Sequence, residues 1–310
     1  MSYDIFVDGA SGTTGLRIFE RIKQRGDMRL ITLTEERRKD INARLEAVEK
    51  ADLSILCLPD IASKEIASLA PENAKICDTS TAHRTDEGWV YGFPEIRKRD
   101  AIRASKRVSI PGCHASGFIS VAAPLVQGGL LPDEAYLSVN SLTGYSGGGK
   151  SMIAQYENEK NEKMYSPRMY GLTLSHKHLK EMQKVCELKN TPLFTPVVDD
   201  YYCGMLVSVP LFLPLLKEVH SAEDVREYLR EYYKGEPLIT VNPLNTLPDE
   251  GFLAANTLAG RDGMSISVYA KDDMLLITSL FDNLGKGSSG AALQCANIML
   301  GTEETKGLII

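Results

Sequence analysis

One cysteine in this sequence lies where its thiol could act as a nucleophile. Cys113 follows Pro111 and Gly112 at the end of a strand-like stretch, and the apolar segment 118–126 that comes next is expected to be helical. The dipole and unpaired amides of a helix N-terminus stabilise a thiolate and lower its pKa from the reference of about 8.5. The other cysteines lie in or beside core strands, within helical patterns or in a Tyr-rich loop. The pattern therefore predicts covalent catalysis by Cys113.

A thiolate nucleophile works beside a base, and one short segment supplies two histidines. His176 and His178 lie two residues apart, and Glu181 follows where it can orient an imidazole. Such a group could also bind a metal, but no cysteine or further carboxylate completes a tetrahedral set, so we expect no metal. His114, next to Cys113, is a third histidine near the thiol. His176, His178 and His114 are therefore all candidates for the acid/base.

A glycine-rich loop near the N-terminus is typical of nucleotide binding. The predicted strand 3–8 runs directly into Gly9-Ala10-Ser11-Gly12-Thr13-Thr14-Gly15, which opens a helix. Glycines allow a tight turn and let a pyrophosphate approach the unpaired amides of the helix N-terminus. We therefore expect the following residues to bind a dinucleotide: Gly9, Ser11, Gly12, Thr13, Thr14 and Gly15.

The segment after the second predicted strand bears on which dinucleotide binds. It reads Thr34-Glu35-Glu36-Arg37-Arg38. An acidic residue here holds a ribose 2′-hydroxyl, whereas arginines suit a 2′-phosphate, which two adjacent guanidiniums can hold bidentately. We therefore predict NADP(H), held by Arg37 and Arg38. The alternative is a solvated run of charges.

Two further segments are suited to anion binding. Residues 78–84 lie at the end of a predicted strand, where doubly wound folds place ligands and where an arginine can hold a carboxylate. Residues 142–150 place flexible backbone amides beside a hydroxyl and a lysine. An interdomain ion pair for Arg84 and a flexible surface loop for 142–150 are the alternatives. The predicted substrate-binding residues are Ser80, Arg84, Ser146 and Lys150.

The elements that must position these residues change character along the chain. In the first third, short strands alternate with helices, which predicts a doubly wound parallel sheet of the Rossmann type. The expected strands are 3–8, 30–33, 52–58 and 74–78, and the expected helices are 14–24 and 62–70. From about residue 113, longer strands with alternating polarity predict a second, α+β domain on a mixed or antiparallel sheet. These strands are 136–142, 205–211, 265–270 and 274–280, the last two forming a hairpin.

Two helices complete this organisation. Ser221 is expected to cap a surface helix that carries Val225, Leu229 and Tyr232 on one face and stops at Gly235. A small-residue helix over 287–300 could return to pack on the first domain. We therefore predict a nucleotide domain of residues 1–112 plus 285–310, and a catalytic, substrate-binding and oligomerisation domain of residues 113–284.

Composition excludes several classes of protein. The chain has 310 residues, a formal net charge of −6 and a pI near 5.5, which argues against an electrostatic nucleic-acid binder and favours small-molecule partners. No apolar run approaches the length of about 18 residues that a spanning helix needs, and the start lacks a signal-peptide pattern. Six scattered cysteines without a CxxC pair argue against a disulfide framework. We expect a cytoplasmic protein without a membrane partner.

Taken in order, these motifs resemble those of the N-acetyl-gamma-glutamyl-phosphate reductases, in their shorter variety. The matching segments are 9–15, 78–84, Tyr91-Gly92-Phe93-Pro94-Glu95, 111–113, 146–150, 176–181 and Asp282-Asn283-Leu284-Gly285-Lys286-Gly287. The Tyr-Gly-Phe-Pro-Glu box, the Pro-Gly-Cys segment and the His-x-His-x-x-Glu segment separate this family from the aspartate-semialdehyde and glyceraldehyde-phosphate dehydrogenases. The sequence departs from longer members at His114, where an aromatic residue is common, and at 200–205, which lacks their Arg-Gly.

The resemblance implies a reaction and roles for the site residues. NADPH would reduce N-acetyl-gamma-glutamyl phosphate to N-acetylglutamate 5-semialdehyde and phosphate, as a step of arginine biosynthesis. Cys113 would form the thioester, and His176 would act as acid/base with support from His178 and Glu181. The resemblance also implies that Asn283 and Lys286 lie near the nicotinamide. A homodimer or homotetramer would form through the sheet of the second domain.

Two other functions fit the same motifs. The chain could reduce another acyl phosphate, such as aspartyl phosphate or a carrier-bound aminoadipyl or glutamyl phosphate. It could also be a non-catalytic NADP(H) sensor. Retention of Cys113 at a helix N-terminus together with paired histidines favours an enzyme.

Overall fold

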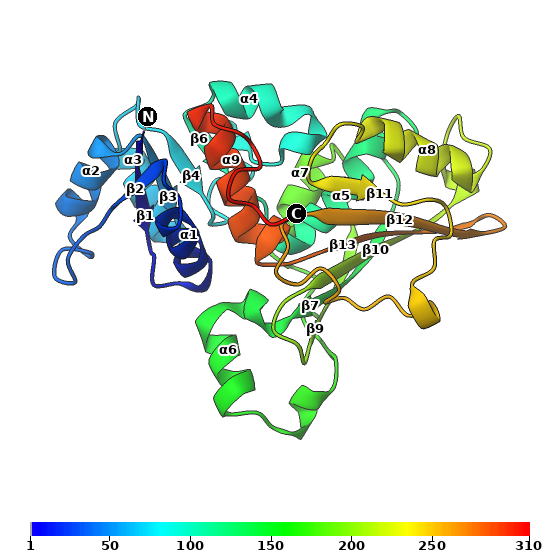
Figure 1. The fold of residues 1–310 in the computed structure, drawn as a ribbon. Coiled ribbons are helices and arrows are strands. Elements are labelled where there is room, and N and C mark those ends of the chain that lie inside the picture. The colour runs from blue at the N-terminus through cyan, green and yellow to red at the C-terminus, as the bar shows by residue number, and fades with distance from the viewer. Residues whose placement is uncertain (1) are drawn as a thin grey trace. The chain divides into compact units, whose positions relative to one another are not determined.

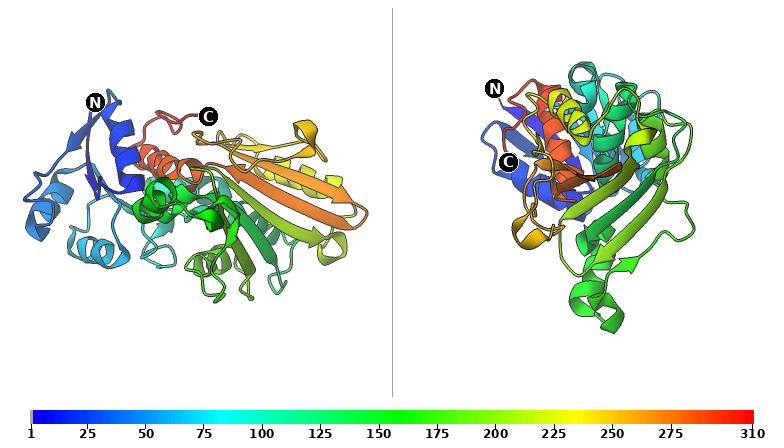
Figure 2. Two further views of the ribbon diagram at one scale, coloured as in Figure 1. Left: turned by 90° about the horizontal axis from the view of Figure 1, so that it is seen from below. Right: turned by 90° about the vertical axis from the view of Figure 1, so that its right-hand side faces the viewer.

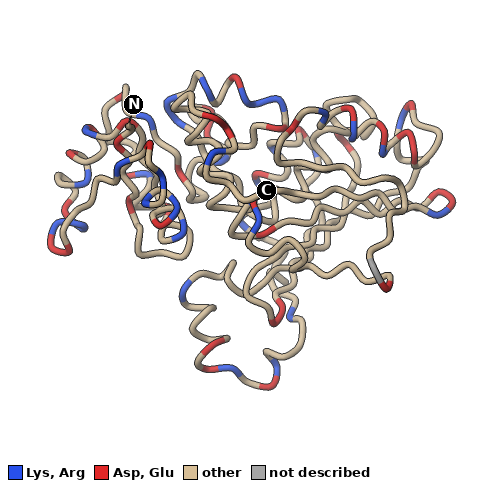
Figure 3. The backbone as a smooth tube through the Cα atoms, in the orientation of Figure 1, with Lys and Arg blue, Asp and Glu red and all other residues tan. Residues whose placement is uncertain are grey.

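In a computed structural model that describes residues 2–310, the chain divides into two units (Figure 1). The first unit consists of the chain up to Gly112 together with Ser288–Leu308, and the second of Cys113–Gly287 with Ile309 and Ile310. Basic and acidic residues are interspersed along the backbone of both units (Figure 3). Within the described chain, no helix is both long enough and apolar enough to span a membrane.

The first unit is built on a six-stranded sheet in which every pairing is parallel. The strand order is β2-β1-β3-β4-β6-β5. The strands are β1 (Tyr3–Asp8), β2 (Met28–Ile31), β3 (Leu53–Leu56), β4 (Ile76–Asp78), β5 (Val90–Tyr91) and β6 (Arg107–Ser109). The helices are α1 (Thr13–Lys23), α2 (Ile41–Lys50), α3 (Asp60–Leu69), α4 (Arg99–Ala104) and α9 (Gly290–Leu300), with a π-helical turn at Pro94–Lys98.

Helices cover both faces of this sheet because successive residues of a buried strand point to opposite sides. In β1, Ile5 and Val7 belong to one hydrophobic core with α1, α4 and α9. Phe6, between them, belongs to a second core with α2 and α3. The predicted doubly wound arrangement is therefore confirmed, including the return of the last helix to the first domain.

The second unit is built on a seven-stranded mixed sheet with the order β11-β12-β13-β10-β7-β9-β8. Its strands are β7 (Ser138–Gly144), β8 (Arg168–Met169), β9 (Leu193–Asp199), β10 (Met205–Phe212), β11 (Ile239–Val241), β12 (Met264–Lys271) and β13 (Met274–Phe281). Its helices are α5 (Cys113–Gln127), α6 (Gly149–Asn158), α7 (Leu179–Val185) and α8 (Ala222–Tyr232). The β7–β9 and β11–β12 pairs are parallel and the rest are antiparallel. The predicted hairpin is confirmed, with Lys271 paired to Met274.

Helices α5 and α8 pack on the sheet of this unit (Figure 2). The side chains that α5 covers include Val207 of β10, and a Cβ at Gly117 of α5 would lie only 2.3 Å from a methyl carbon of Val207. Gly117 therefore lets the helix approach the sheet closely one turn after Cys113. Helix α8 begins with the predicted capping box of Ser221 and Asp224, and it buries Val225 and Leu229.

Near the C-terminus, the structure differs from the expected domain division and helix start at three points. Residues Gly285–Gly287 group with the second unit, because the amides of Gly285 and Gly287 donate to the carbonyl of Asp282. The returning helix begins at Gly290, after a π-helical turn over Gly285–Ser289. The last two residues also group with the second unit, where the amide of Ile309 donates to the Asp262 carboxylate at 2.8 Å.

Candidate active site

The glycine loop after β1 forms a turn with no room for side chains at two positions. Gly9 has a φ of +84°, and a Cβ there would lie 2.3 Å from the carbonyl oxygen of Cys57. A Cβ at Gly15 would lie 2.4 Å from the carbonyl oxygen of Gly9. Only glycine combines a positive φ with such close backbone approach, so the loop has the geometry that the sequence predicted.

The first turn of α1 has donors that suit a phosphate. Gly12 is the N-cap and offers no side-chain cap for the helix amides. The hydroxyl oxygen of Thr13 is buried and has no hydrogen-bond partner within the described structure. Thr14 shares a 2.9 Å hydrogen bond with Ser288 of the same unit. An uncapped N-terminus beside an orphaned buried hydroxyl fits an anionic pyrophosphate.

A buried ion pair lies directly before this loop. The Arg44 guanidinium of α2 donates to the Asp8 carboxylate, the last residue of β1, with an Nε to Oδ2 distance of 2.8 Å. Both residues are buried, and burial raises the pKa of Asp8 although the hydrogen bond from Arg44 acts in the opposite direction. Sequence reasoning missed Arg44. The sequence pattern that could have revealed it is a charged residue on the apolar face of α2, beside Ala43, Ala47 and Val48.

Arg37 and Arg38 lie in a turn after β2, where both backbone amides donate to the carbonyl of Thr34. Their side chains are about half exposed and pair with Glu46 at 3.2 Å and Glu35 at 2.8 Å, respectively. Exposed pairs of this kind are weak, so a ligand phosphate can compete for the guanidiniums.

The loop after β4 is organised by Asp78, which is fully buried. Its carboxylate accepts from the backbone amide and the hydroxyl of Ser80 and lies 2.6 Å from Nδ1 of His83. Burial alone would raise the pKa of Asp78, but these hydrogen bonds outweigh it and lower the pKa. The Ser80 hydroxyl therefore orders the loop. Arg84 donates to the backbone carbonyls of Ile110 at 2.9 Å and Thr79 at 3.0 Å, which holds its guanidinium in place.

In the second unit, Cys113 is the first residue of α5 and is partly exposed. A Cβ at Gly287 would lie 2.9 Å from the Cβ of Cys113, so glycine leaves space beside the thiol. The ring of His114, the next residue, lies 5.8 Å from that of His176 and 5.6 Å from that of His178, between centroids. The structure thus brings the three predicted histidines together, and one of them directly follows the predicted nucleophile in the chain.

The two histidines of the 176–181 segment differ in environment. His176 is partly exposed, and its Nδ1 accepts from the backbone N–H of His178 at 3.2 Å. Its neutral form therefore carries the proton on Nε2. His178 and Glu181 are buried, with 3.9 Å between Nε2 and Oε1. This burial suits His178 and Glu181 for support, and the exposure of His176 suits it for contact with a substrate.

The predicted residues of the 142–150 and 282–287 segments meet in the same unit. The Asn283 amide donates to the Ser146 hydroxyl at 3.0 Å and accepts from the Gly204 amide at 2.8 Å. Ser146 lies in a 3₁₀ turn before α6, and Lys150 is exposed in the first turn of that helix. The segment is thus a strand end, a turn and a helix rather than a flexible loop. Lys286 is buried in the π-helical turn.

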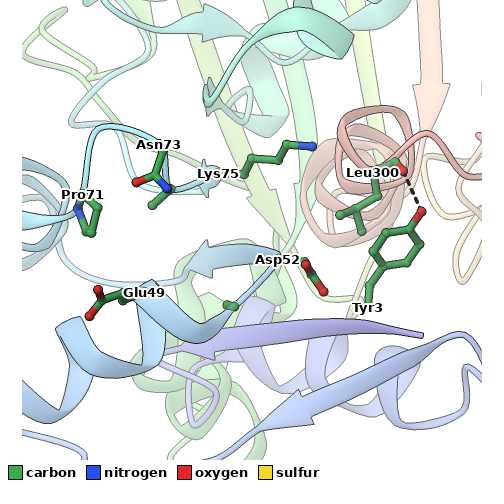
Figure 4. Close-up of a pocket in the computed structure, with 9 residues that line it drawn as sticks. Tyr3, Glu49, Asp52, Pro71, Asn73, Lys75 and Leu300 are labelled. Carbon is green, nitrogen blue, oxygen red and sulfur yellow. Dashed lines mark hydrogen bonds between the residues drawn. The ribbon is translucent and has the colours of Figure 1, made fainter. Parts of the chain in front are cut away.

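In the described part of the chain, neither a metal site nor a cavity in the first unit offers an alternative active site. Among the side chains that the structure describes, no three His, Cys, Asp or Glu are placed to hold a metal ion. A cavity of about 300 Å³ is lined by Tyr3, Asp52 and Lys75, among others (Figure 4). These residues lie at the amino ends of the strands, whereas ligands of open parallel sheets bind at the carboxyl ends.

Comparison with known proteins identifies the class. A family model described as "Semialdehyde dehydrogenase, NAD binding domain" matches residues 4–105. A second model, "Semialdehyde dehydrogenase, dimerisation domain", matches residues 113–283. The chain is therefore built as a semialdehyde dehydrogenase, with an NAD(P)-binding domain and a dimerisation domain that indicates an oligomer.

Individual relatives identify the family more specifically than the two domain models do. "N-acetyl-gamma-glutamyl-phosphate reductase 2" of Nostoc sp. is 41% identical, with 98% of each chain covered. The enzyme of the same name from Pseudomonas putida is also 41% identical over 98% of each chain, and "N-acetyl-gamma-glutamyl-phosphate reductase" of Brucella ovis is 42% identical, covering 97% of this chain and all of the relative. The chain belongs to the N-acetyl-gamma-glutamyl-phosphate reductase family, and the resemblance seen in the motifs is confirmed.

Solved structures agree on the fold. Aspartate semialdehyde dehydrogenase II from Vibrio cholerae has a TM-score of 0.74 at 16% identity, covering 97% of this chain and 99% of that one. The aspartate semialdehyde dehydrogenase with NADP from Candida albicans has a TM-score of 0.65 at 14% identity, with 97% and 99% covered. At such low identity the similarity confirms the fold class.

Proposed function

We propose that the chain catalyses the NADPH-dependent reduction of N-acetyl-gamma-glutamyl phosphate to N-acetylglutamate 5-semialdehyde and phosphate, in arginine biosynthesis. The observation that carries this proposal is the position of Cys113 at the start of α5, directly before His114, whose ring clusters with those of His176 and His178. The relatives that align over nearly the whole chain are named for this activity.

The Cys113 thiolate attacks the acyl carbon of the substrate, a carbon–sulfur bond forms, and the carbon–oxygen bond to the phosphate breaks. The helix N-terminus favours the thiolate before attack. When bound, the nicotinamide supplies the hydride that reduces the thioester. His176 donates a hydrogen bond from Nε2–H to the oxygen that develops negative charge; when this oxyanion collapses, the carbon–sulfur bond breaks, the Cys113 thiolate leaves and the aldehyde is released. His178 and Glu181 hold the segment that carries His176.

The cofactor is NADP(H) in this proposal. The turn at Gly9 and the first turn of α1, with Thr13 and Thr14, hold the pyrophosphate, and Arg37 and Arg38 hold the 2′-phosphate. Two guanidiniums in one exposed turn support this preference over NAD(H). Asn283 and Lys286 would lie toward the nicotinamide.

The substrate is held by residues of two segments. Arg84, already oriented by backbone carbonyls, presents its guanidinium to a carboxylate, while Ser80 orders the loop around it. Ser146 and the exposed Lys150 attract the phosphate.

The oligomer is a homodimer or homotetramer formed through the sheet of the second unit. Register places Phe212 opposite Met274 and Pro210 opposite Leu276, so these side chains share one face of β10 and β13. Phe212, Met274 and Leu276 are 60%, 50% and 40% exposed, whereas the alternate residues toward α5 are buried. Such an exposed apolar face is typical of a subunit interface. Light scattering after gel filtration measures the number of subunits.

We also propose a cytoplasmic location. No disulfide joins the cysteines of the described chain, which is typical of proteins from a reducing compartment. Fractionation of cells that produce the protein tests this location.

The decisive test is phosphate-dependent reduction of NADP⁺ with N-acetylglutamate semialdehyde, run beside aspartate semialdehyde and beside NAD⁺. Turnover confined to the acetylated aldehyde and favouring NADP⁺ supports the proposal. Cys113→Ser should abolish turnover and keep NADPH binding, whereas Cys203→Ser, a second partly exposed thiol in this unit, should retain turnover. Equal turnover with aspartate semialdehyde, or full activity of Cys113→Ser, would overturn the proposal.

A further inference from the structure

Arg44 links the two segments of the first unit that are proposed to hold the cofactor. It lies in the first turn of α2, the helix that follows the 34–38 turn, and its Nε donates to the carboxylate of Asp8, the last residue before the glycine loop. Strands β1 and β2 are parallel neighbours, with Phe6 paired to Ile31, so both segments leave the sheet at its carboxyl edge. The Arg44 side chain thus reaches from the helix that follows one cofactor segment to the strand end that precedes the other.

One nitrogen of the Arg44 guanidinium has no partner. Nη2 is buried without a hydrogen-bond acceptor in the described structure, and the residue is only 8% exposed. The side chain is held by the 2.8 Å bond from Nε to Asp8 and by its place on the buried face of α2, beside Ala47 and Val48. A buried charged donor without an acceptor is unfavourable, so a ligand that supplies the acceptor would be stabilised there.

The chemistry of the Arg44–Asp8 pair selects one part of the cofactor. The glycine loop suits the pyrophosphate and the 34–38 turn suits the 2′-phosphate, and the group between these two in NADP(H) is the adenosine ribose. The Asp8 carboxylate offsets the charge of Arg44 and repels a phosphate, so the pair is poorly suited to a second phosphate contact. It suits a hydroxyl, which accepts a hydrogen bond from Nη2. In NADP(H) the 2′ position carries the phosphate, so the free hydroxyl of this ribose is the 3′-hydroxyl.

We propose that Arg44 is a cofactor-binding residue whose Nη2 donates a hydrogen bond to the 3′-hydroxyl of the adenosine ribose. The bond from Nε to Asp8 holds the guanidinium and so fixes the direction of Nη2. The contact is common to NADPH and NADH, unlike the contacts proposed for Arg37 and Arg38. The proposal rests on the proposed function only in placing the cofactor on the glycine loop and the 34–38 turn.

The test measures binding by the full chain and needs no turnover. Dissociation constants of ADP and of 3′-deoxy-ADP are measured by isothermal titration calorimetry in the wild type and in Arg44→Lys, which keeps a cation for Asp8 but lacks Nη2. In the wild type, 3′-deoxy-ADP should bind at least about tenfold more weakly than ADP, because a hydrogen bond from a charged donor is lost. Arg44→Lys should weaken ADP binding by a similar factor and leave 3′-deoxy-ADP binding unchanged.

Further titrations separate this contact from damage to the glycine loop. Inorganic pyrophosphate occupies the loop without a ribose, so its dissociation constant should be the same in Arg44→Lys and in the wild type. Arg29→Lys changes the exposed pair with Asp4 at the other end of β1, and it should leave all three constants unchanged. Arg44→Lys should also weaken NADPH and NADH binding by one common factor.

The possible results separate this proposal from the proposed function. Equal binding of ADP and 3′-deoxy-ADP by the wild type overturns the proposal, and so does a loss of 3′-deoxy-ADP and pyrophosphate binding in Arg44→Lys as large as the loss of ADP binding. If Arg44→Lys does not fold, Asp8→Asn combined with Arg44→Met removes both charges and takes its place in the same titrations. The expected pattern in an enzyme that does not turn over N-acetylglutamate semialdehyde would instead overturn the proposed function and leave this inference in place.

Discussion

Removing the Arg44 guanidinium should destabilise the first unit strongly, although Arg44 lies outside the predicted site. Arg44→Met keeps much of the side-chain volume but leaves the Asp8 carboxylate buried without its partner. Breaking a buried pair from one side costs about 3–5 kcal/mol. That is a large part of the typical total of about 5–15 kcal/mol for a domain.

The stability lost in Arg44→Met should grow as pH rises. Burial already raises the pKa of Asp8 in the folded chain above its unfolded value. A group of this kind stabilises the fold below the unfolded pKa, and the stabilisation is lost as pH rises through the folded pKa. Without Arg44 the folded pKa rises further, so the loss extends to higher pH. The variant should therefore lose progressively more stability than the wild type as pH rises above the unfolded pKa of Asp8.

The assay uses a single fluorophore. Trp89 is the one tryptophan of the sequence and packs against the core that contains α2. Urea unfolding followed by Trp89 fluorescence therefore reports on this unit. Arg29→Met is the matched control, because Arg29 pairs with Asp4 at the other end of β1 but is exposed, and it should change little.

A double variant tests whether the lost stability comes from the unpaired buried charge. Asp8→Asn combined with Arg44→Met removes both charges, so the double variant should be more stable than Arg44→Met alone at neutral pH. Equal, pH-independent losses in Arg44→Met and Arg29→Met, or additive losses in the double variant, would refute the argument from buried charge.

Three further predictions follow from single contacts. Gly9→Ala combines a φ of +84° with a 2.3 Å clash against the Cys57 carbonyl, so the Kd for NADPH should rise about tenfold or more; unchanged binding in a fluorescence titration would contradict this. Asn283→Ala leaves the Gly204 amide without its 2.8 Å acceptor and should destabilise the second unit by about 1–3 kcal/mol, measured by urea unfolding monitored by circular dichroism. Ser221→Ala removes the helix cap of α8 and should cost about 1 kcal/mol in the same assay, with Ser221→Asp restoring it.

Local patterns were sufficient for most of the architecture. The alternation of short apolar strands with helices predicted the parallel sheet, because each layer must bury one face of every element. The capped helix α8 and the turn at Gly9 were also predicted, since caps and positive φ values select particular residue types at single positions. Strand β9 was missed because Pro196 interrupts its pattern and removes one donor. Helix α2 was missed because its small apolar residues flank Arg44.

The sequence by itself thus determined the fold class, the nucleotide loop and the position of Cys113 at a helix start, all of which depend on neighbouring residues. Only the tertiary structure decided which polar groups meet. Arg44 finds Asp8 36 residues away, and Asn283 finds Ser146 137 residues away. No local pattern encodes such pairs, because their geometry follows from strand register and from how closely a helix packs on its sheet.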